Sequence, residues 1–494
     1  MGSTIFSTSE LAKITKPFTG EVTFDRLQAA QKAIERLYLD RQYLTSGAYI
    51  PTEQVLAIDG AVVRIQIVEG KLEAIQVTGT HRLNPEYIRS RLALATRQPL
   101  NNDRLIEGLH LLQQDPLIGS IAAELSNGVQ PGTNLLEIKV TENNTFHSEI
   151  ATNNHRPPSI GGWQRRAQIT EANLTGWGDT LILAYSNTDG SNGIDTSYTV
   201  PLSPSQTTLS VNLGGTNSQI VEEPYRWRSL SEGESLDLTT NARYAEVSVR
   251  HPLLRRAGQD ATQEFALSLT GSRLESSSAL GGTPYPLSLG ADDNGRIGVS
   301  AVRFGQEYIY RDSRSVLALR SQLNVGVGAL NATINHNAPD SRFVSWQGQG
   351  RWLKQLAPHT DLILQGRVQL ADRSLVSLEQ FAVGGATTVR GYRQDALLAD
   401  NGAFASVELQ LPIGNSQNNM LQVAPFIDVG TVWNNTSNSS PGGNTLLSAG
   451  LGLQWRGDNL SARIDWGIPL INAPSQKRSL QDNGLYFSVR YFPF

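Results

Sequence analysis

The residues with the clearest chemical potential are an arginine in a long polar segment and an aspartate in an alternating one. Arg390 lies in the run TVRGYR, inside a polar connection of about 372–402 that is long for a compact protein. Asp428 is the centre of the run FIDVG. The planar fork of an arginine matches a carboxylate, and Gly391 would let the backbone turn sharply beside it. A salt bridge between Arg390 and Asp428 is therefore an attractive interpretation, with position rather than stability as its purpose.

Residue types that form catalytic or metal centres are present without the spacing that such centres need. No two histidines are four residues apart and none lies near a carboxylate cluster, so each is interpreted as a surface or turn residue. The sequence contains no phosphate-binding loop and no Gly-x-Ser-x-Gly run. We therefore predict neither an enzyme nor a cofactor or metal site.

The composition excludes several classes of protein. A net charge of −4 argues against nucleic-acid binding, and the absence of cysteine excludes disulfides and thiolate metal sites. The sequence contains no run of 18 apolar residues, so it predicts no transmembrane helix. Met1–Ile14 lacks the apolar core of a signal peptide. The composition is still compatible with a transmembrane β-barrel, because the strands of such a barrel alternate apolar and polar residues over about ten positions and keep the mean hydropathy modest.

The first 145 residues or so combine helical and strand patterns in two small α/β units. One helical face carries Leu27, Ala30, Ile34 and Leu37. Two strands follow that helix, and Gly79 ends the first unit; the second unit repeats the theme. The expected helices are 24–38, 84–94 and 101–114, and the expected strands are 61–68, 72–77, 118–125 and 134–140.

From Phe146 onward helix signals stop and strict alternation of apolar and polar residues takes over. In the segment 420–430, Ile427 and Val429 would face lipid, whereas Phe426, Asp428 and Gly430 would face the lumen of a barrel. An even number of strands, sixteen, leaves both ends on the same side. The expected strands are 146–153, 162–172, 180–187, 196–202, 206–214, 243–250, 262–271, 296–306, 314–328, 342–354, 360–370, 403–412, 420–430, 446–456, 459–467 and 484–492.

A soluble β-sandwich would show the same alternation, and Asp428 by itself is compatible with simple lumen polarity. Connection lengths favour the membrane barrel. Short turns alternate with long connections at about 215–241, 272–295, 372–402, 434–445 and 467–483. Tight turns on one side and long loops on the other are typical of outer-membrane barrels.

Together these features resemble a known family. TVRGYR on a loop, FIDVG on the next strand, two N-terminal α/β units and a terminal phenylalanine are similar to the two-partner secretion transporters (TpsB) of the outer-membrane assembly superfamily. Residues 44–54 and 68–79 resemble the first POTRA domain and the opening of the second, and residues 173–179 resemble the first inner turn of the barrel. The resemblance covers essentially the whole chain.

The resemblance implies two POTRA domains followed by a 16-stranded antiparallel transmembrane barrel with an inward-folded sixth outer loop. The two POTRA domains would be 1–72 and 73–145, and the barrel would be 146–494. The first domain would be N-terminally truncated, because residues 2–7 resemble the sequence after the first strand of that domain. The lid motif would be Val389, Arg390, Gly391 and Tyr392, and the lock on the barrel wall Phe426, Asp428 and Gly430.

The resemblance further implies a monomeric outer-membrane translocase with its POTRA domains in the periplasm. Its partners would be outer-membrane lipid, the barrel-assembly machinery and a large unfolded TpsA-type protein, which is an adhesin, a cytolysin or a toxin. The signal for barrel insertion would be Phe487, Val489, Tyr491 and Phe494, although Pro493 interrupts the alternation. The alternatives are a membrane-protein insertase of the same superfamily, a passive porin and a soluble β-rich binding protein.

Overall fold

The computed structural model describes two compact units of the chain. The first contains residues 1–144, 175–178 and 256–258, and the second contains the rest. Within the described ranges, no helix is long and apolar enough to cross a membrane. The described residues are 2–21, 23–54, 60–222, 227–228, 235–336, 339–416, 418–436, 443–472 and 479–493.

The helices of the first unit begin at polar residues that bond to the first helical turn. Ser7 and Glu10 form a capping box, in which the Ser7 amide donates to the Glu10 carboxylate at 2.9 Å. Thr23, Asn84 and Asn101 accept hydrogen bonds from first-turn amides of the other three helices. The helices are α1 (Thr8–Thr15), α2 (Phe24–Asp40), α3 (Pro85–Ala95) and α4 (Asn102–Gln113), with the 3-10 turn η1 (Lys16–Phe18) after α1.

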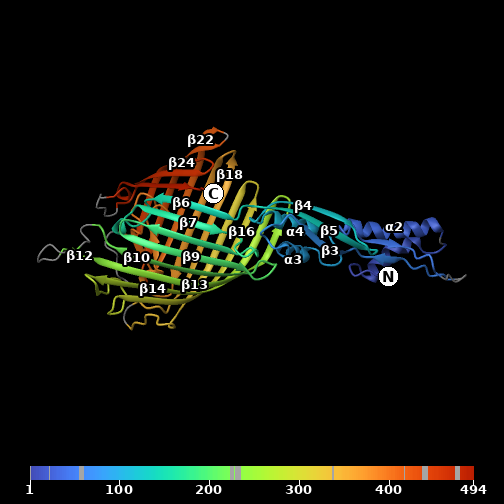
Figure 1. Cartoon of the computed structure of the whole chain (residues 1–494), viewed down its shortest axis with the longest axis horizontal. Coiled ribbons are helices and arrows are strands. Elements are labelled where there is room, and N and C mark those ends of the chain that lie inside the picture. The colour runs from blue at the N-terminus through green and yellow to red at the C-terminus, as the bar shows by residue number, and fades with distance from the viewer. Residues whose placement is uncertain are drawn as a thin grey trace. The chain divides into compact units, whose positions relative to one another are not determined.

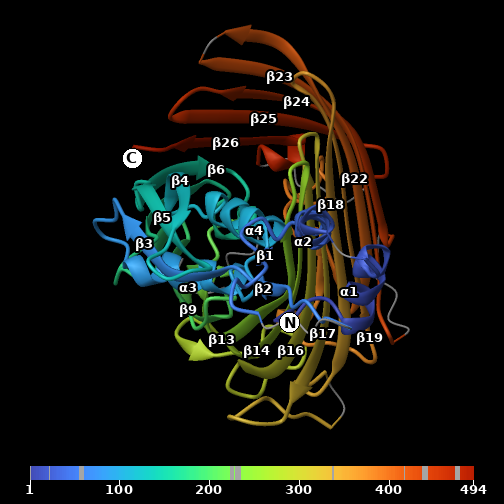
Figure 2. The same ribbon diagram turned by 90° about the vertical axis from the view of Figure 1, so that its right-hand side faces the viewer.

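Two small sheets pack against these helices. An antiparallel pair, β1 and β2, lies with α2, and a three-stranded sheet has the order β3-β5-β4, with β3 parallel to β5. In the second sheet, β3 contacts α3 and β4 contacts α4 (Figure 2). The strands are β1 (Gly47–Tyr49), β2 (Gln66–Val68), β3 (Lys71–Thr78), β4 (Ile118–Asn127) and β5 (Thr133–Glu142).

Helical periodicity located α2, α3 and α4 to within two residues but did not indicate α1. No residue of α1 is buried, so this helix carries no apolar stripe that a sequence pattern could reveal. The strand expected at 61–68 begins only at Gln66. The strand expected at 72–77 is bonded to β5, so it belongs to the second sheet rather than to the first helix–strand unit.

A carboxylate directly after β2 fastens the start of the chain to the first unit. Glu69 accepts the amide of Thr4 at 2.8 Å and the hydroxyl of Tyr38 at 2.8 Å. Burial raises the pKa of Glu69, but the hydrogen bonds from Thr4 and Tyr38 outweigh it and the pKa lies below its usual 4.5. Burial, with a contribution from the Glu69 carboxylate, raises the pKa of Tyr38 to about 12, so its hydroxyl remains a donor at neutral pH.

Substituting Glu69→Gln is expected to loosen the N-terminal segment and to remove a pH dependence. Because folding lowers the pKa of Glu69, its stabilisation is fully present above pH 4.5 and is lost as the pH falls through the folded-state pKa. At neutral pH the substitution should cost about 1 kcal/mol, a low value for charged hydrogen bonds because the carboxyl is only partly buried. Faster amide hydrogen exchange at Thr4 and Ile5 is the measurement.

The control is Glu53→Gln, which changes an exposed carboxyl in the same unit. Equal exchange rates at Thr4 in the two variants would contradict the role given to Glu69.

The second unit is a closed antiparallel barrel. In the described part of the chain, sixteen long strands follow one another around it, and β26 pairs with β6 to close the sheet. Figure 1 shows the barrel strands from the side, and Figure 2 shows β26 beside β6. The long strands are β6 (Phe146–Asn153), β7 (Gln164–Glu171), β8 (Thr180–Asn187), β9 (Ser191–Pro201), β10 (Thr208–Gln219), β13 (Leu238–Ala257), β14 (Ala261–Leu280), β16 (Arg296–Asp312), β17 (Ser315–Val327), β18 (Val344–Ala357), β19 (Thr360–Ala371), β22 (Asn401–Ser416), β23 (Asn419–Trp433), β24 (Thr445–Arg456), β25 (Leu460–Pro469) and β26 (Leu485–Tyr491).

Shorter elements lie in the connections between the long strands. β11 pairs with β12 and β20 pairs with β21, while β15 extends the edge of β14. These elements are η2 (Pro158–Ile160), β11 (Trp227–Arg228), β12 (Ser235–Leu236), β15 (Thr283–Pro284), η3 (Ser377–Glu379), β20 (Phe381–Val383), β21 (Leu397–Ala399) and η4 (Gln481–Asn483).

Alternation along the strands separates an apolar outer face from a polar inner face. In β23, Ile427 is 57% exposed, whereas Asp428 is 0% exposed. Residues paired across neighbouring antiparallel strands share a face. Asp428 pairs with Ser406 of β22 and with Ser448 of β24, so these two serines also lie on the inner face of the barrel.

The sequence predicted the number and order of the barrel strands, but it made several of them too short. β13 and β14 have 20 residues each, where the apolar alternation indicated 243–250 and 262–271. Their added ends are largely polar, and strand pairing continues there because the ladder uses backbone groups only. The connection expected at 215–241 shortens to 220–237, because β10 also extends to Gln219, and the one expected at 272–295 shortens to 281–295.

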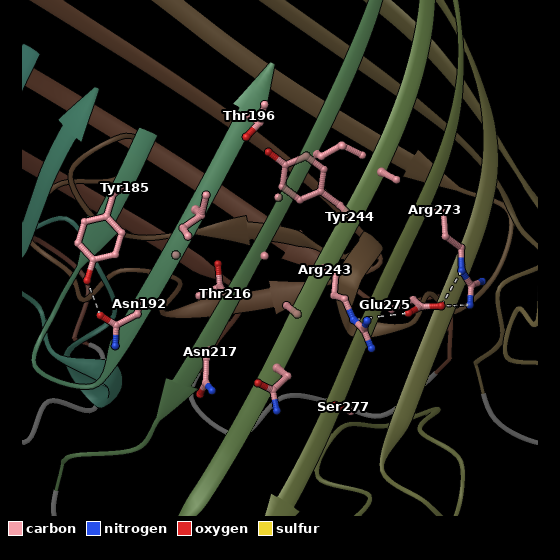
Figure 3. A pocket seen from close by; sticks show the side chains of 18 residues that line it. Tyr185, Asn192, Thr196, Thr216, Asn217, Arg243, Tyr244, Arg273, Glu275 and Ser277 are labelled. Atoms are coloured by element: carbon pink, nitrogen blue, oxygen red, sulfur yellow. Dashed lines mark hydrogen bonds and ion pairs between the residues drawn. The ribbon is translucent and has the colours of Figure 1, made fainter. Parts of the chain in front are cut away.

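The outer face changes from apolar to polar towards the side of the long connections. Tyr185, Gly215 and Arg243 lie in one row across β8, β10 and β13. Arg243 and Glu275 of β14 form an ion pair there, with 3.9 Å between Nε and Oε2, beside a groove on the outer wall (Figure 3). Two residues before Gly215 in β10, the outward side chain of Leu213 is 48% exposed. The row therefore marks one edge of the apolar band.

Candidate functional site

The connection between β19 and β22, residues 372–400, is a compact structure, here termed the 372–400 loop. β20 and β21 pair within it. Gly384 and Gly385 turn the chain with φ of +116° and +95°, a region that favours glycine. The Gly385 amide then donates to the carbonyl of Val389 at 3.1 Å, and Val389 is fully buried. The TVRGYR run is thus held inside a hydrogen-bonded fold.

Arg390 and Asp428 are in direct contact. The Nε and Nη2 atoms of Arg390 donate to the two carboxylate oxygens of Asp428 at 2.8 and 2.9 Å, which is bidentate pairing. The backbone amide of Arg390 donates to the same carboxylate at 3.1 Å. Arg390 is 6% and Asp428 0% exposed, so solvent competes little with this pair.

Three further charged residues complete a network around this pair. The Nη1 atom of Arg390 donates to Glu408 of β22 at 2.7 Å and lies 3.4 Å from Asp465 of β25. Arg463 of β25 bridges the same two carboxylates at 2.7 and 2.6 Å. Two guanidinium groups therefore share three carboxylates across three strands of the wall.

The other residues of the two motifs allow this close approach. Phe426 lies beneath the guanidinium, with Arg390 Cζ 3.4 Å from the ring centroid. A Cβ atom at Gly430 would lie 2.4 Å from a methyl group of Val383 and 2.9 Å from one of Val389. Gly391 has a φ of +99°, and glycine at these two positions lets the loop lie directly on the wall.

Tyr392 and the last strand hold the backbone of the loop. The Tyr392 hydroxyl lies 2.8 Å from the carbonyl oxygens of Leu447 and Ile471. Tyr486 of β26 donates its hydroxyl to the Tyr392 carbonyl and accepts the amide of Gly391 at 3.1 Å. All four lid-motif residues and all three lock residues therefore lie together, in contact with strands from β22 to β26.

Sequence reasoning identified Arg390 and Asp428 but missed Glu408, Arg463 and Asp465. All three were on the polar faces of expected strands, which was the available signal. Their convergence depends on register, which pairs Asp428 with Ser406 and Gly452 with Asp465. In the described part of the chain, no group of three or more His, Cys, Asp or Glu residues is arranged to hold a metal ion.

Comparison with known proteins identifies the family. Residues 132–455 match the model of the haemolysin secretion/activation proteins ShlB/FhaC/HecB, and residues 1–70 match a POTRA domain of the ShlB type. The chain belongs to the ShlB/FhaC/HecB family.

Curated relatives of this family member are transporters. The outer membrane transporter CdiB of Dickeya dadantii (strain 3937) is 21% identical over 456 residues, which cover 88% of this chain and 75% of the relative. The heme/hemopexin transporter protein HuxB of Haemophilus influenzae (strain 86-028NP) is 23% identical over 448 residues, covering 86% and 73%.

Solved structures show the same fold. CdiB from Escherichia coli superposes with a TM-score of 0.73 at 17% identity, over 99% of this chain and 89% of that one. BamA from Haemophilus ducreyi lacking POTRA domains 1–3 gives a TM-score of 0.55 at 15% identity, over 98% and 97% of the two chains.

This member of the ShlB/FhaC/HecB family is therefore an outer-membrane translocase of the two-partner secretion type, with its POTRA region in the periplasm. The family implies a secreted partner protein. Its relatives are transporters rather than enzymes. The comparisons do not favour an insertase or a passive porin, and the closed barrel of this family replaces the soluble β-rich alternative.

The strand expected to carry the insertion signal forms the seam of the barrel. Phe487 makes an edge-to-face contact with Trp163, with 5.6 Å between ring centroids. Val489 and Tyr491 pair with residues of β6, where the sheet closes. Phe494 lies outside the described residues.

Replacing Arg390 with Gln should leave Glu408, Asp428 and Asp465 with Arg463 as the single cation of the network. Removing one partner from a buried charge network costs about 3–5 kcal/mol, so the barrel should unfold at a lower temperature. The temperature at which the folded band is lost in heat-modifiability gels is the measurement. In the double variant Arg390→Gln/Asp428→Asn, part of the lost stability should return, because the second change removes the carboxylate that lost its partner.

The matched control is Arg165→Gln, which breaks an exposed pair with Asp189 on the same barrel. That variant should change stability by about 1 kcal/mol or less. A smaller loss of barrel stability in Arg390→Gln than in Arg165→Gln would contradict the role given to the charge network.

Proposed function

We propose that the 372–400 loop is a lid inside the barrel lumen and that Arg390 anchors it to the wall. The observation that carries this proposal is the bidentate pair of Arg390 with Asp428, a residue on the inner face of β23. Glu408 and Asp465 belong to the same inner face, because they alternate with outward residues of β22 and β25. A loop whose arginine meets all three carboxylates occupies space through which an exported chain would pass.

The chemistry of the anchor suits a lid that must be released. A buried ion network fixes geometry strongly, yet its net contribution to stability is often near zero, because desolvation offsets the Coulomb attraction. Such a network places the lid without making its displacement prohibitive. The exported chain would enter the space that the lid leaves.

The exported partner is proposed to be a large TpsA-type protein that is unfolded in transit and forms a β-helix afterwards. Residues 1–72 and 73–145 would act as two periplasmic POTRA domains. In the second, β3 and β4 end the described sheet, and each is bonded to β5 on one side. An open sheet edge can capture an extended segment by adding it as a further strand. The barrel 146–494 would act as a monomer in outer-membrane lipid, after insertion by the assembly machinery.

Substituting Arg390→Ala should reduce secretion of the partner at least tenfold, because the lid loses its place on the wall. The secreted and periplasmic fractions of the partner are measured in cells with equal amounts of folded barrel. Arg165→Ala, which removes an exposed outer arginine, should secrete normally. Normal secretion by Arg390→Ala would refute the lid anchor.

Deleting residues 2–144 should abolish secretion but leave ion conductance through the barrel. The deletion removes partner capture and leaves the wall of the pore complete. Secretion assays in cells and planar-bilayer conductance of the purified variant test the two halves. Continued export without these residues would show that capture lies elsewhere.

A further inference from the structure

Three arginines line the inner wall beside the lid, on strands that its anchor does not use. Arg320, Arg351 and Arg367 lie on the successive strands β17, β18 and β19. Arg320 and Arg367 share a row, each paired with Gln349, and Arg351 follows Gln349 two residues along β18. The row continues to Phe404 of β22, which is 4% exposed and pairs with the inner-face residue Gly430. All three arginines therefore face the lumen.

These three arginines have little compensating charge, unlike the arginines of the inner wall that pair closely with carboxylates. Across the described residues, Arg351 and Arg367 make no hydrogen bond and no ion pair with a protein group. Arg320 donates a hydrogen bond to the neutral side chain of Gln322 at 2.6 Å, and its contact with a carboxylate is long, 3.9 Å to Glu307. That carboxylate already accepts a hydrogen bond from Arg250 at 2.9 Å. By contrast, Arg303, Arg390 and Arg463 each contact a carboxylate within 2.8 Å.

Open space lies in front of these arginines, between β17–β19 and the lid. A cavity of about 440 Å³ is lined by all three, and a second of about 320 Å³ shares Gln349, Arg367 and Thr387 with it. Thr387 directly precedes the TVRGYR run. Asp395 of the lid lines the second cavity without reaching ion-pair distance of Arg367. A partly buried guanidinium without a partner is unfavourable unless water or an anion occupies the space before it.

We propose that Arg320, Arg351 and Arg367 form a contact strip that binds acidic side chains of the exported polypeptide as it passes the lid. Guanidinium groups bind carboxylates in a planar, bidentate manner. Strands are about 4.8 Å apart, so cations on three neighbouring strands present a stripe about 10 Å wide to an extended segment. The strip rests on the proposed function, because it gives the exported chain a path along β17–β19, away from the anchor on β22–β26.

The test measures block of ion current through the purified full-length protein in planar bilayers. A ten-residue polyglutamate and a ten-residue polylysine are added to the POTRA side, with wild-type protein and with Arg390→Ala. Polyglutamate should block at a lower concentration than polylysine. In the double variant Arg351→Gln/Arg367→Gln, the half-blocking concentration of polyglutamate should rise at least tenfold.

Two further variants keep the result decisive. Arg351→Lys/Arg367→Lys retains the charge and should retain most of the block. Arg166→Gln changes an inner-face arginine of β7 that contacts Gln168 and Asp195, and it should leave the block unchanged. Heat-modifiability gels show that each variant is folded.

Equal block by the two peptides, or an unchanged half-blocking concentration in the Gln double variant, would overturn the strip. That result would leave the lid intact as a proposal if Arg390→Ala still fails to secrete. Normal secretion by Arg390→Ala would refute the lid instead, whatever the peptides do.

Discussion

The structure of the site depends on one electrostatic constraint: three buried carboxylates on the inner wall need two guanidinium groups. Arg463 comes from the wall itself, but the second, Arg390, comes from the 372–400 loop. Without the loop, Glu408, Asp428 and Asp465 would be near one another with a single cation, a costly arrangement in a poorly solvated place. The wall is therefore complete only when the loop is seated. Phe426 beneath the guanidinium and Gly430 beside the loop backbone shape the surface that receives it.

Seating of the loop is also coupled to closure of the barrel. Tyr486, which bonds to the backbone of Gly391 and Tyr392, lies on β26, and β26 closes the sheet by pairing with β6. The strand expected to carry the insertion signal thus completes the wall and holds the loop. The arginine strip on β17–β19 faces a different side of the same loop. Under the proposed function, the strands β22–β26 hold the loop, and open, cationic space lies in front of β17–β19.

The sequence was informative where a pattern repeats and where a residue type is rare. Alternation gave the barrel strands, their order and the inner position of Asp428. The isolated Arg390 in a long connection made a salt bridge attractive, but only the family resemblance brought it to Asp428. Glu408, Arg463 and Asp465 were visible as polar-face residues, but alternation does not specify how far one strand is shifted against the next. The ends of β13 and β14 were missed because they leave the apolar band, and α1 because none of its residues is buried.

A disulfide between the loop and the wall tests the central claim most directly. The chain has no cysteine, so Val389→Cys/Gly430→Cys introduces the only pair, and a third change, Val383→Ala, removes the methyl group that would otherwise lie 2.4 Å from the new Cβ atom. A Cβ atom at Gly430 would lie 2.9 Å from a methyl group of Val389, within reach of a disulfide. The account predicts that this disulfide forms in intact cells and stops secretion until a reductant is added. Absence of the cross-link, or normal secretion by the cross-linked protein, would contradict it.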